Sequence, residues 1–289
     1  LAVLLGTLYP LIIDFMGLGK ISVGASWFNT MFVPLGLLLA FIIAPGSTSR
    51  WKADELKRIG SASVVALIAA VILGFATPFM MRGELNWQVV LGIFVSTWLV
   101  AATLLDMWRK ARGNLRRIPT LGLSYLGMVI AHIGVAVSIV GVVMVSNYSI
   151  EKAVRMSVGD EAKLGNYRFV MTDLGKIEGP NYVSDMARIE VYRDEKLITA
   201  LKPEKRRYNA SGSIMTEAAI DVSLLRDVYV SMGEPLTDGA WGVRLQVKSF
   251  MRWVWLGAIF MAIGGVLAIL DKRYRPRTHK AEQAKAVEA

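Results

Sequence analysis

The chain has 289 residues, of which 54% are apolar and only 19% are charged. Soluble domains carry about 25% charged residues, so this composition excludes a disordered chain, a coiled coil and an ordinary soluble enzyme, and it favours a bilayer protein. The chain has no cysteine, which excludes a disulfide framework, a thiolate metal site and any thiol chemistry of its own. Because Leu1 lies inside an apolar run with no methionine before it, we expect a fragment or a processed chain rather than a signal peptide.

The net charge of +10 is concentrated in three basic clusters that flank apolar runs. Residues 147–250 hold 15 basic and 15 acidic residues and therefore contribute no net charge. The clusters lie within residues 50–58, 109–117 and 272–285. Basic segments beside apolar runs are typical of the cytoplasmic loops of membrane proteins, so we expect no nucleic acid partner.

Six apolar runs are long enough, or nearly long enough, to cross a bilayer, which takes about 20 residues. In chain order they are Leu1–Ile13, Phe28–Ala44, Gly60–Met81, Leu85–Leu105, Leu121–Ser146 and Phe250–Leu270. The first run is cut short at its start, and Pro45-Gly46 is expected to end the second. These runs predict an α-helical polytopic membrane protein with about six transmembrane helices.

The basic clusters also predict how the chain crosses the membrane. Positively charged loops remain in the cytoplasm, which places loops 45–59 and 106–120 and the tail from Asp271 on that side. The charge-balanced segment 147–250 then lies on the opposite side. We expect three parts: a five-span portion of a transmembrane bundle in 1–146, an external domain in 147–250, and a last transmembrane helix with a basic tail in 251–289.

The external segment differs in kind from the rest, because short runs of alternating apolar and polar residues are separated by turn residues. Candidate strands are Tyr167–Thr172, Arg188–Arg193, Leu197–Leu201 and Val243–Lys248. Asp194-Glu195-Lys196 joins two of them as an expected hairpin, whereas Ala218–Val230 fits either a strand or a helix. We expect a small β-rich domain, inserted before the last transmembrane helix.

His132 is the strongest candidate for chemistry, because it lies about midway between Arg117 and Asn147, deep in the fifth run. A polar group at that depth is costly and usually has a partner inside the bundle. Small residues at 4-3-4-3 spacing form a flat stripe beside it, where another helix or a planar ligand can approach: Gly127, Ala131, Gly134, Ser138 and Gly141. The residues alone leave three roles open for His132, which are axial ligand of a haem iron, partner in a structural interhelical hydrogen bond, and proton relay.

Other residues carry weaker signals. His279 lies in the basic tail and is expected to be solvated. Glu217 and Asp221 form a carboxylate pair, for which we expect a solvated or salt-bridged face, and Gly17-Leu-Gly-Lys20 resembles a phosphate cradle only superficially. Three basic residues near the outer face are better explained as interfacial anchors than as contacts to haem propionates: Lys20, Arg82 and Arg252.

Motifs along the whole chain match one known family. In the membrane part they are Leu5-Gly-Thr-Leu-Tyr-Pro10, Gly17-Leu-Gly-Lys-Ile-Ser-Val-Gly24 and Ala131-His132-Ile-Gly134. In the β-rich segment and the last helix they are Pro203-Glu-Lys-Arg206, Met215-Thr-Glu-Ala-Ala-Ile-Asp221, Arg226-Asp227, Gly239-Ala-Trp241 and Arg252-Trp-Val-Trp255. These segments resemble the C-terminal half of the cytochrome c-type biogenesis family CcmF, the haem lyase subunit of the bacterial cytochrome c maturation system.

The resemblance implies a place in a bacterial inner membrane, with residues 147–250 in the periplasm. It implies a component of the enzyme that takes haem from the chaperone CcmE and attaches it to CxxCH thiols of apocytochrome c, presented with CcmH. It also implies that His132 is one axial ligand of a transmembrane b-type haem. The second ligand would come from an N-terminal half that is a split subunit or is missing from this sequence, so we do not expect this fragment alone to be a competent lyase, and no catalytic residue is assigned.

Two other functions stay open beside this one. The first is a non-catalytic membrane scaffold that docks maturation partners. The second is a transporter component with His132 in a proton path. Transport predicts more intramembrane charge than one histidine, whereas Asp14, Asp106 and Asp271 lie at the ends of predicted spans.

Overall fold

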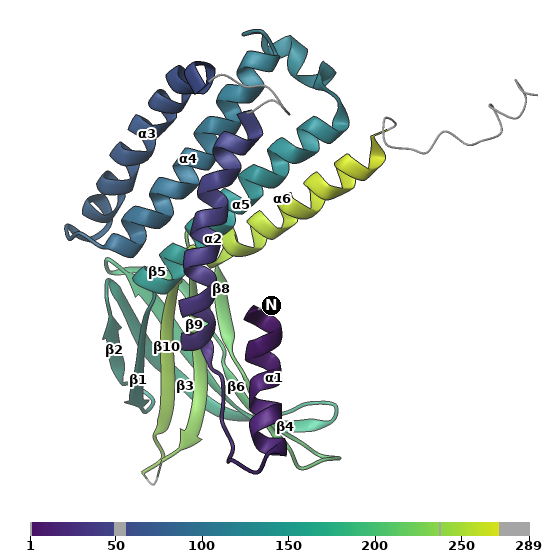
Figure 1. The fold of residues 1–289 in the computed structure, drawn as a ribbon. Coiled ribbons are helices and arrows are strands. Elements are labelled where there is room, and N and C mark those ends of the chain that lie inside the picture. The colour runs from purple at the N-terminus through teal and green to yellow at the C-terminus, as the bar shows by residue number, and fades with distance from the viewer. Residues whose placement is uncertain (1, 49–55, 237, 272–289) are drawn as a thin grey trace, which may run out of the picture. The chain divides into compact units, whose positions relative to one another are not determined.

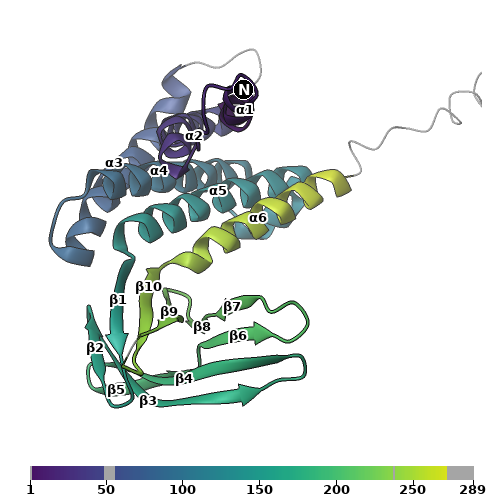
Figure 2. The same cartoon turned by 90° about the horizontal axis from the view of Figure 1, so that it is seen from below.

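The computed structural model describes residues 2–48, 56–236 and 238–271. The chain divides into two units, one made of Leu1–Ile139 with Gly257–Ala289 and the other of Val140–Leu256. Helices make up the first unit, and the strands belong to the second (Figures 1 and 2). His279 lies outside the described residues, as do the basic residues at 272–285.

The described membrane part contains six α-helices and one 3-10 helix. Their bounds are α1 Ala2–Phe15, α2 Ala25–Thr48, α3 Leu56–Arg82, α4 Trp87–Lys110, η1 Leu115–Leu121, α5 Leu123–Tyr148 and α6 Met251–Leu270. Five of these helices, α2 to α6, are long and apolar enough to cross a membrane, and α1 is an apolar helix of 14 residues. The predicted class, a polytopic helical membrane protein with a β-rich domain before its last helix, is confirmed, with five full-length spans and one shorter helix among the described residues.

Helix α2 continues through Pro45, so the prediction that Pro45-Gly46 ends the second run is wrong. A proline has no N–H, and the carbonyl oxygen four residues earlier therefore loses its helical partner. That oxygen belongs to Phe41, and Trp98 Nε1 on α4 donates a hydrogen bond to it at 3.1 Å. The two rings also stack, with centroids 5.8 Å apart. A neighbouring helix satisfies the group that the proline frees, which is how membrane helices tolerate proline.

Helix α4 is the most buried of the candidate spans. In its most apolar 18-residue segment 56% of the residues are buried, against at most 28% in the corresponding segments of the others. Its start is fixed by Asn86, whose side chain accepts hydrogen bonds from the backbone N–H groups of Gln88 and Val89. Small residues of α2 and α3 pack against it around the fully buried Leu99: Ala44, Ala66 and Ala70. This close packing makes α4 the centre of the first unit.

The second unit contains ten strands in two antiparallel sheets (Figure 2). Their bounds are β1 Ile150–Met156, β2 Glu161–Leu164, β3 Tyr167–Glu178, β4 Tyr182–Arg193, β5 Lys196–Leu201, β6 Glu204–Tyr208, β7 Ile214–Glu217, β8 Ala219–Val222, β9 Arg226–Pro235 and β10 Trp241–Ser249. One sheet has the order β1-β10-β9-β8, and the other has the order β2-β3-β4-β6-β7 with β5 paired to β4. Alternate residues from both sheets form one core, in which the largest fully buried side chains include Phe169, Met171, Ile189, Met232 and Leu245.

The four candidate strands lie within β3, β4, β5 and β10, so the expected β-rich domain is confirmed. The hairpin between β4 and β5 turns at Asp194 and Glu195, which both have positive φ, 49° and 61°. Positive φ at both central residues is the pattern of the tight turn that matches the twist of paired strands. The ambiguous run Ala218–Val230 forms strands, β8 and the first half of β9.

Candidate functional site around His132

The small-residue stripe of α5 lies against α6. A Cβ atom added to Gly134 would lie 2.7 Å from the carbonyl oxygen of Gly257 and 2.8 Å from the nitrogen of Met261. One added to Gly141 would lie 2.6 Å from the nitrogen of Val254. Backbones approach this closely only where side chains are absent or very small. The stripe is therefore packed against a helix, and a planar ligand has no room there.

Asp271 ties the end of α6 to the beginning of α5. Its Oδ2 accepts a hydrogen bond from the backbone N–H of Ser124 at 2.8 Å, and the residue is only 6% exposed. Ser124 lies in the first turn of α5, where unpaired N–H groups and the helix dipole favour a negative charge. The stripe and this contact together fix how α5 lies against α6.

His132 lies on the side of α5 away from this interface. Successive helical residues are about 100° apart, which places His132 about 160° from Gly134 and about 20° and 40° from Tyr125 and Ala136. Tyr125 Oη donates a hydrogen bond to Asp106 Oδ2 on α4 at 2.6 Å. Ala136 packs in an apolar cluster with residues of α4. The side of α5 that carries His132 is therefore turned toward α4.

The depth of His132 differs from the expected midpoint. Residues 115–121 form η1 and are not part of the span, so α5 begins only at Leu123. At 1.5 Å per residue, His132 is about 14 Å along the helix from Leu123 and about 24 Å from Tyr148. The histidine is still well inside an apolar helix, nearer to the end that follows η1.

The imidazole ring has one nitrogen that is both buried and without a protein partner. His132 Nδ1 is buried and makes no hydrogen bond to any other described residue, and the ring as a whole is half-buried. A buried polar atom without a partner is costly, and His132 carries this one within a stretch of α5, from Met128 to Val137, whose other residues are apolar. A neutral imidazole can give one nitrogen to a haem iron, so the residue fits one axial position and no more.

Asp106 is the buried acid nearest to this face, and sequence reasoning assigned it only to a span end. It is 7% exposed, and besides Tyr125 it contacts Lys110 Nζ at 2.9 Å. Lys110 also lies over the Tyr125 ring, 4.2 Å from its centroid. The spacing of Asp106 and Lys110, four residues apart on one helix, was the available signal for this pair. The three side chains satisfy one another and join α4 to α5 at the end near η1.

The candidate polar residues of the external unit are engaged in ion pairs. Arg252 Nε lies 3.7 Å from Asp227 Oδ1. The two carboxylates noted in the sequence are paired as expected, Asp221 with Arg226 and Glu217 with Arg206. The φ angles of Gly17 and Gly19 are positive in the loop between α1 and α2, and the glycine-rich segment there serves the turn.

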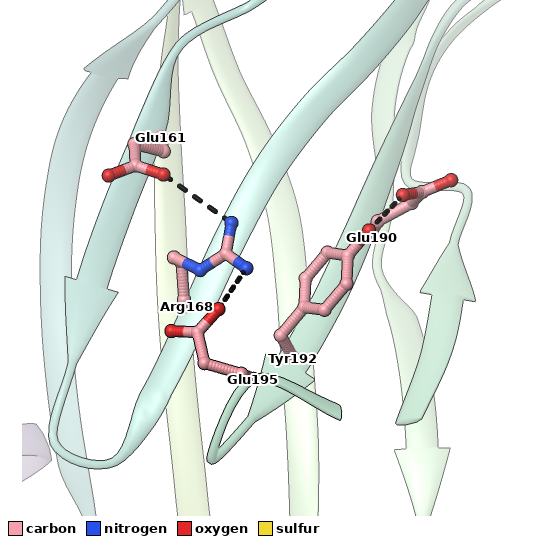
Figure 3. A network of polar contacts seen from close by, with 5 residues as sticks. All are labelled: Glu161, Arg168, Glu190, Tyr192 and Glu195. Carbon is pink, nitrogen blue, oxygen red and sulfur yellow. Dashed lines mark hydrogen bonds and ion pairs between the residues drawn. The ribbon is translucent and has the colours of Figure 1, made fainter. Parts of the chain in front are cut away.

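A further polar network lies on the sheet that contains β3 and β4 (Figure 3). Arg168 reaches Glu195 at 2.8 Å and Glu161 at 3.5 Å, and its guanidinium lies 4.4 Å from the centroid of the Tyr192 ring. Tyr192 Oη donates to Glu190 at 2.7 Å, and this hydrogen bond raises the pKa of the phenol. Exposed pairs of this kind contribute little free energy, so we assign this network no role in the function proposed below.

Comparison with known proteins agrees with this architecture. Residues 147–249 match the family described as the CcmF C-terminal beta-sandwich. The cytochrome c-type biogenesis protein CcmF of Pseudomonas aeruginosa is 45% identical over 275 residues, which are 94% of this chain and 42% of that protein. CcmF of Escherichia coli is 41% identical, over 98% of this chain and 43% of its own. A solved structure of "Cytochrome c Heme Lyase CcmF" has the same fold, with a TM-score of 0.74 at 17% identity over 93% of this chain and 43% of that one.

The apolar spans and the inserted β-sandwich define a multi-pass inner-membrane protein with an external domain. The chain belongs to the CcmF family of cytochrome c-type biogenesis proteins and corresponds to their C-terminal part. It spans 42–43% of the length of these curated relatives.

Proposed function

We propose that this chain is the C-terminal part of a membrane haem lyase. In this role it acts with an upstream part to attach haem, received from the chaperone CcmE, to CxxCH thiols of an apocytochrome c presented with CcmH. The names of its relatives, cytochrome c-type biogenesis proteins, support a role in this process. The chain has no cysteine of its own, as suits an enzyme whose thioether bonds form on the thiols of another protein.

Within this function, His132 is the axial ligand that this chain contributes to a b-type haem in the membrane. The observation that carries the proposal is the buried His132 Nδ1, which has no partner among the described residues. When bound, the haem supplies a redox-active iron. The chain would provide one imidazole nitrogen, carried on an apolar stretch of α5. A second ligand to the iron would come from the upstream part.

The packing of α5 explains how the helix that carries the ring is held. The stripe against α6 and the Asp271 contact fix one side of the helix, and the Asp106–Tyr125 hydrogen bond fixes the other. A histidine ligand must be oriented toward its metal, and a helix held on two sides gives the side chain a fixed backbone from which to reach it. In this geometry α5 is a rigid support that presents His132 on the α4 side.

The test is an absorption spectrum of the chain produced together with the upstream part of a CcmF relative. We expect a low-spin spectrum with sharp α and β bands in the reduced protein. His132→Gln keeps the size and hydrogen-bonding capacity of the side chain but binds iron poorly, so haem is lost or becomes high-spin and cytochrome c maturation falls. His279→Gln, at the other histidine of the chain, is the matched control and leaves the spectrum unchanged.

The same experiment separates the alternatives. If His132 is a structural residue or a proton relay, the spectrum of His132→Gln is the same as that of the unsubstituted protein. If the chain is only a scaffold, neither protein shows haem bands. A wild-type low-spin spectrum and normal maturation in His132→Gln would show that the ligand assignment is wrong.

A further inference from the structure

The turn between β8 and β9 exposes three large apolar side chains. Val222 is 53% exposed, Leu224 is 61% exposed and Leu225 is 54% exposed. The polar groups of the same turn are used internally, because Asp227 Oδ1 accepts a hydrogen bond from the N–H of Ser223 at 3.1 Å and Arg226 pairs with Asp221. The turn is therefore ordered from within, and its outer surface is apolar.

This turn lies at the point where the chain enters its last transmembrane helix. The carbonyl oxygen of Leu225 accepts a hydrogen bond from the N–H of Phe250 at 2.9 Å. Phe250 directly precedes Met251, the first residue of the candidate span α6. Arg252 in the first turn of α6 pairs with Asp227, two residues after Leu225. These contacts lie within one unit of the structure and fix the height of the turn relative to the start of the span.

The first turns of α6 have the side chains of a membrane interface. Trp255 is 66% exposed, and Phe250 and Trp253 form an edge-to-face pair with centroids 5.3 Å apart. Aromatic residues gather at the headgroup level of membranes, and arginine keeps its charge there while its stem contacts apolar groups. The exposed leucines lie beside this belt, and apolar patches bordered by polar residues mark membrane or protein contacts.

We propose that Leu224 and Leu225 enter the outer leaflet beside α6, so that the β8–β9 turn anchors the β-sandwich to the bilayer surface. The occupant of this surface is phospholipid at the boundary between headgroups and acyl chains, which interfacial apolar side chains reach at a depth of about 5–10 Å. The anchor is a third membrane attachment of the external domain, in addition to α5 and α6. It does not depend on haem binding or on His132.

The absence of cysteine from the chain permits a clean test by site-directed labelling. Leu224→Cys is labelled with the environment-sensitive fluorophore NBD in the membrane-embedded protein, in nanodiscs with and without phosphatidylcholine that carries a nitroxide near the glycerol end of an acyl chain. Val158→Cys is the matched control, because Val158 is 55% exposed but follows β1, a strand of seven residues that starts beside α5 and extends for about 23 Å. Leu225→Cys is a second probe, in case a label at position 224 distorts the turn.

The anchor predicts a blue-shifted NBD emission at positions 224 and 225. The intensity of this emission falls when the nitroxide lipid is present and resists quenching by aqueous iodide. The probe at position 158 shows the reverse. Iodide quenching at 224 and 225 equal to that at 158 places the turn in water and overturns the proposal. Probes shielded from both iodide and nitroxide lipid also overturn it, because another protein segment then covers the turn.

Discussion

Single glycines determine how closely α5 and α6 approach each other. Gly264 is buried in this interface, and a Cβ added there would lie 2.8 Å from Ala131 Cβ. Its chain neighbour Gly265 has open space around it, with nothing within 4 Å. Two adjacent residues of the same type therefore have opposite packing demands, which the sequence does not distinguish.

This contrast gives a matched pair of variants. Gly264→Leu forces the helices apart and destabilises the protein by at least the cost of overpacking, about 1–3 kcal/mol. Gly265→Leu adds the same side chain on the open side and leaves stability nearly unchanged. Thermal unfolding followed by circular dichroism in detergent measures both. Equal melting temperatures for the two variants would argue against the α5–α6 contact.

Glu204 provides a pH-dependent contribution to the stability of the β-sandwich. Arg206 Nε donates a hydrogen bond to its carboxylate at 2.8 Å, and this bond lowers the pKa of Glu204. A carboxyl whose pKa is lower in the folded state stabilises the fold above its unfolded pKa, about 4.3. The stabilisation is lost as pH falls through the folded value.

Glu204→Gln is therefore expected to lower the melting temperature at neutral pH, and the difference from the unsubstituted protein shrinks as the pH falls below about 4. Glu178→Gln, at an exposed carboxylate on β3, is the control for loss of one negative charge. The measurement is the melting temperature of each variant across this pH range. A difference for Glu204→Gln that persists unchanged at acidic pH contradicts the assigned hydrogen bond.

At the scale of the element, apolar run length predicted each full-length span to within a few residues, because no soluble structure explains such runs. The end of α2 was predicted wrongly because the hydrogen bond that replaces the missing N–H of Pro45 comes from Trp98, 57 residues away from Phe41. The Ser124–Asp271 contact joins residues 147 apart and was invisible for the same reason. Short strands such as β7 and β8, of four residues each, show too little alternation to be found by period.

The explanation for the proline in α2 can be tested by substitution. Trp98→Phe leaves the Phe41 carbonyl without its donor and should destabilise the protein by about 1 kcal/mol or more. Adding Pro45→Ala to this variant restores a backbone N–H to the same carbonyl and should recover part of the loss. Melting temperatures of the two single variants and the double variant form a cycle. If Pro45→Ala helps equally with and without Trp98, the two donors do not serve the same oxygen.

At the scale of the whole molecule, the distribution of charge predicts on which side of the membrane each loop lies. Alkaline phosphatase is active only outside the cytoplasm, so a fusion at Ser211, in the turn between β6 and β7, is expected to be active. A fusion at Gly113, between α4 and η1, is expected to be inactive because basic loops remain inside. An active enzyme at Gly113 reverses the topology.

The candidate site was predictable in part. A lone histidine inside an apolar run stands out in the sequence, and the resemblance to CcmF directed attention to the same residue. Which side of α5 faces α6 and which faces α4 depends on contacts with distant segments, such as Gly257 and Asp106. A pattern within one helix cannot identify such partners. Only the structure therefore excluded a planar ligand at the stripe, because it shows α6 packed there.

The central claim is that His132 gives a nitrogen to haem iron, and chemical rescue tests it most directly. His132→Gly, made in the chain together with the upstream part of a relative, removes the imidazole and leaves space for an added one. We predict a high-spin spectrum that returns to low-spin when free imidazole is added, because the small molecule replaces the lost ligand. A low-spin spectrum in His132→Gly without added imidazole would contradict the account.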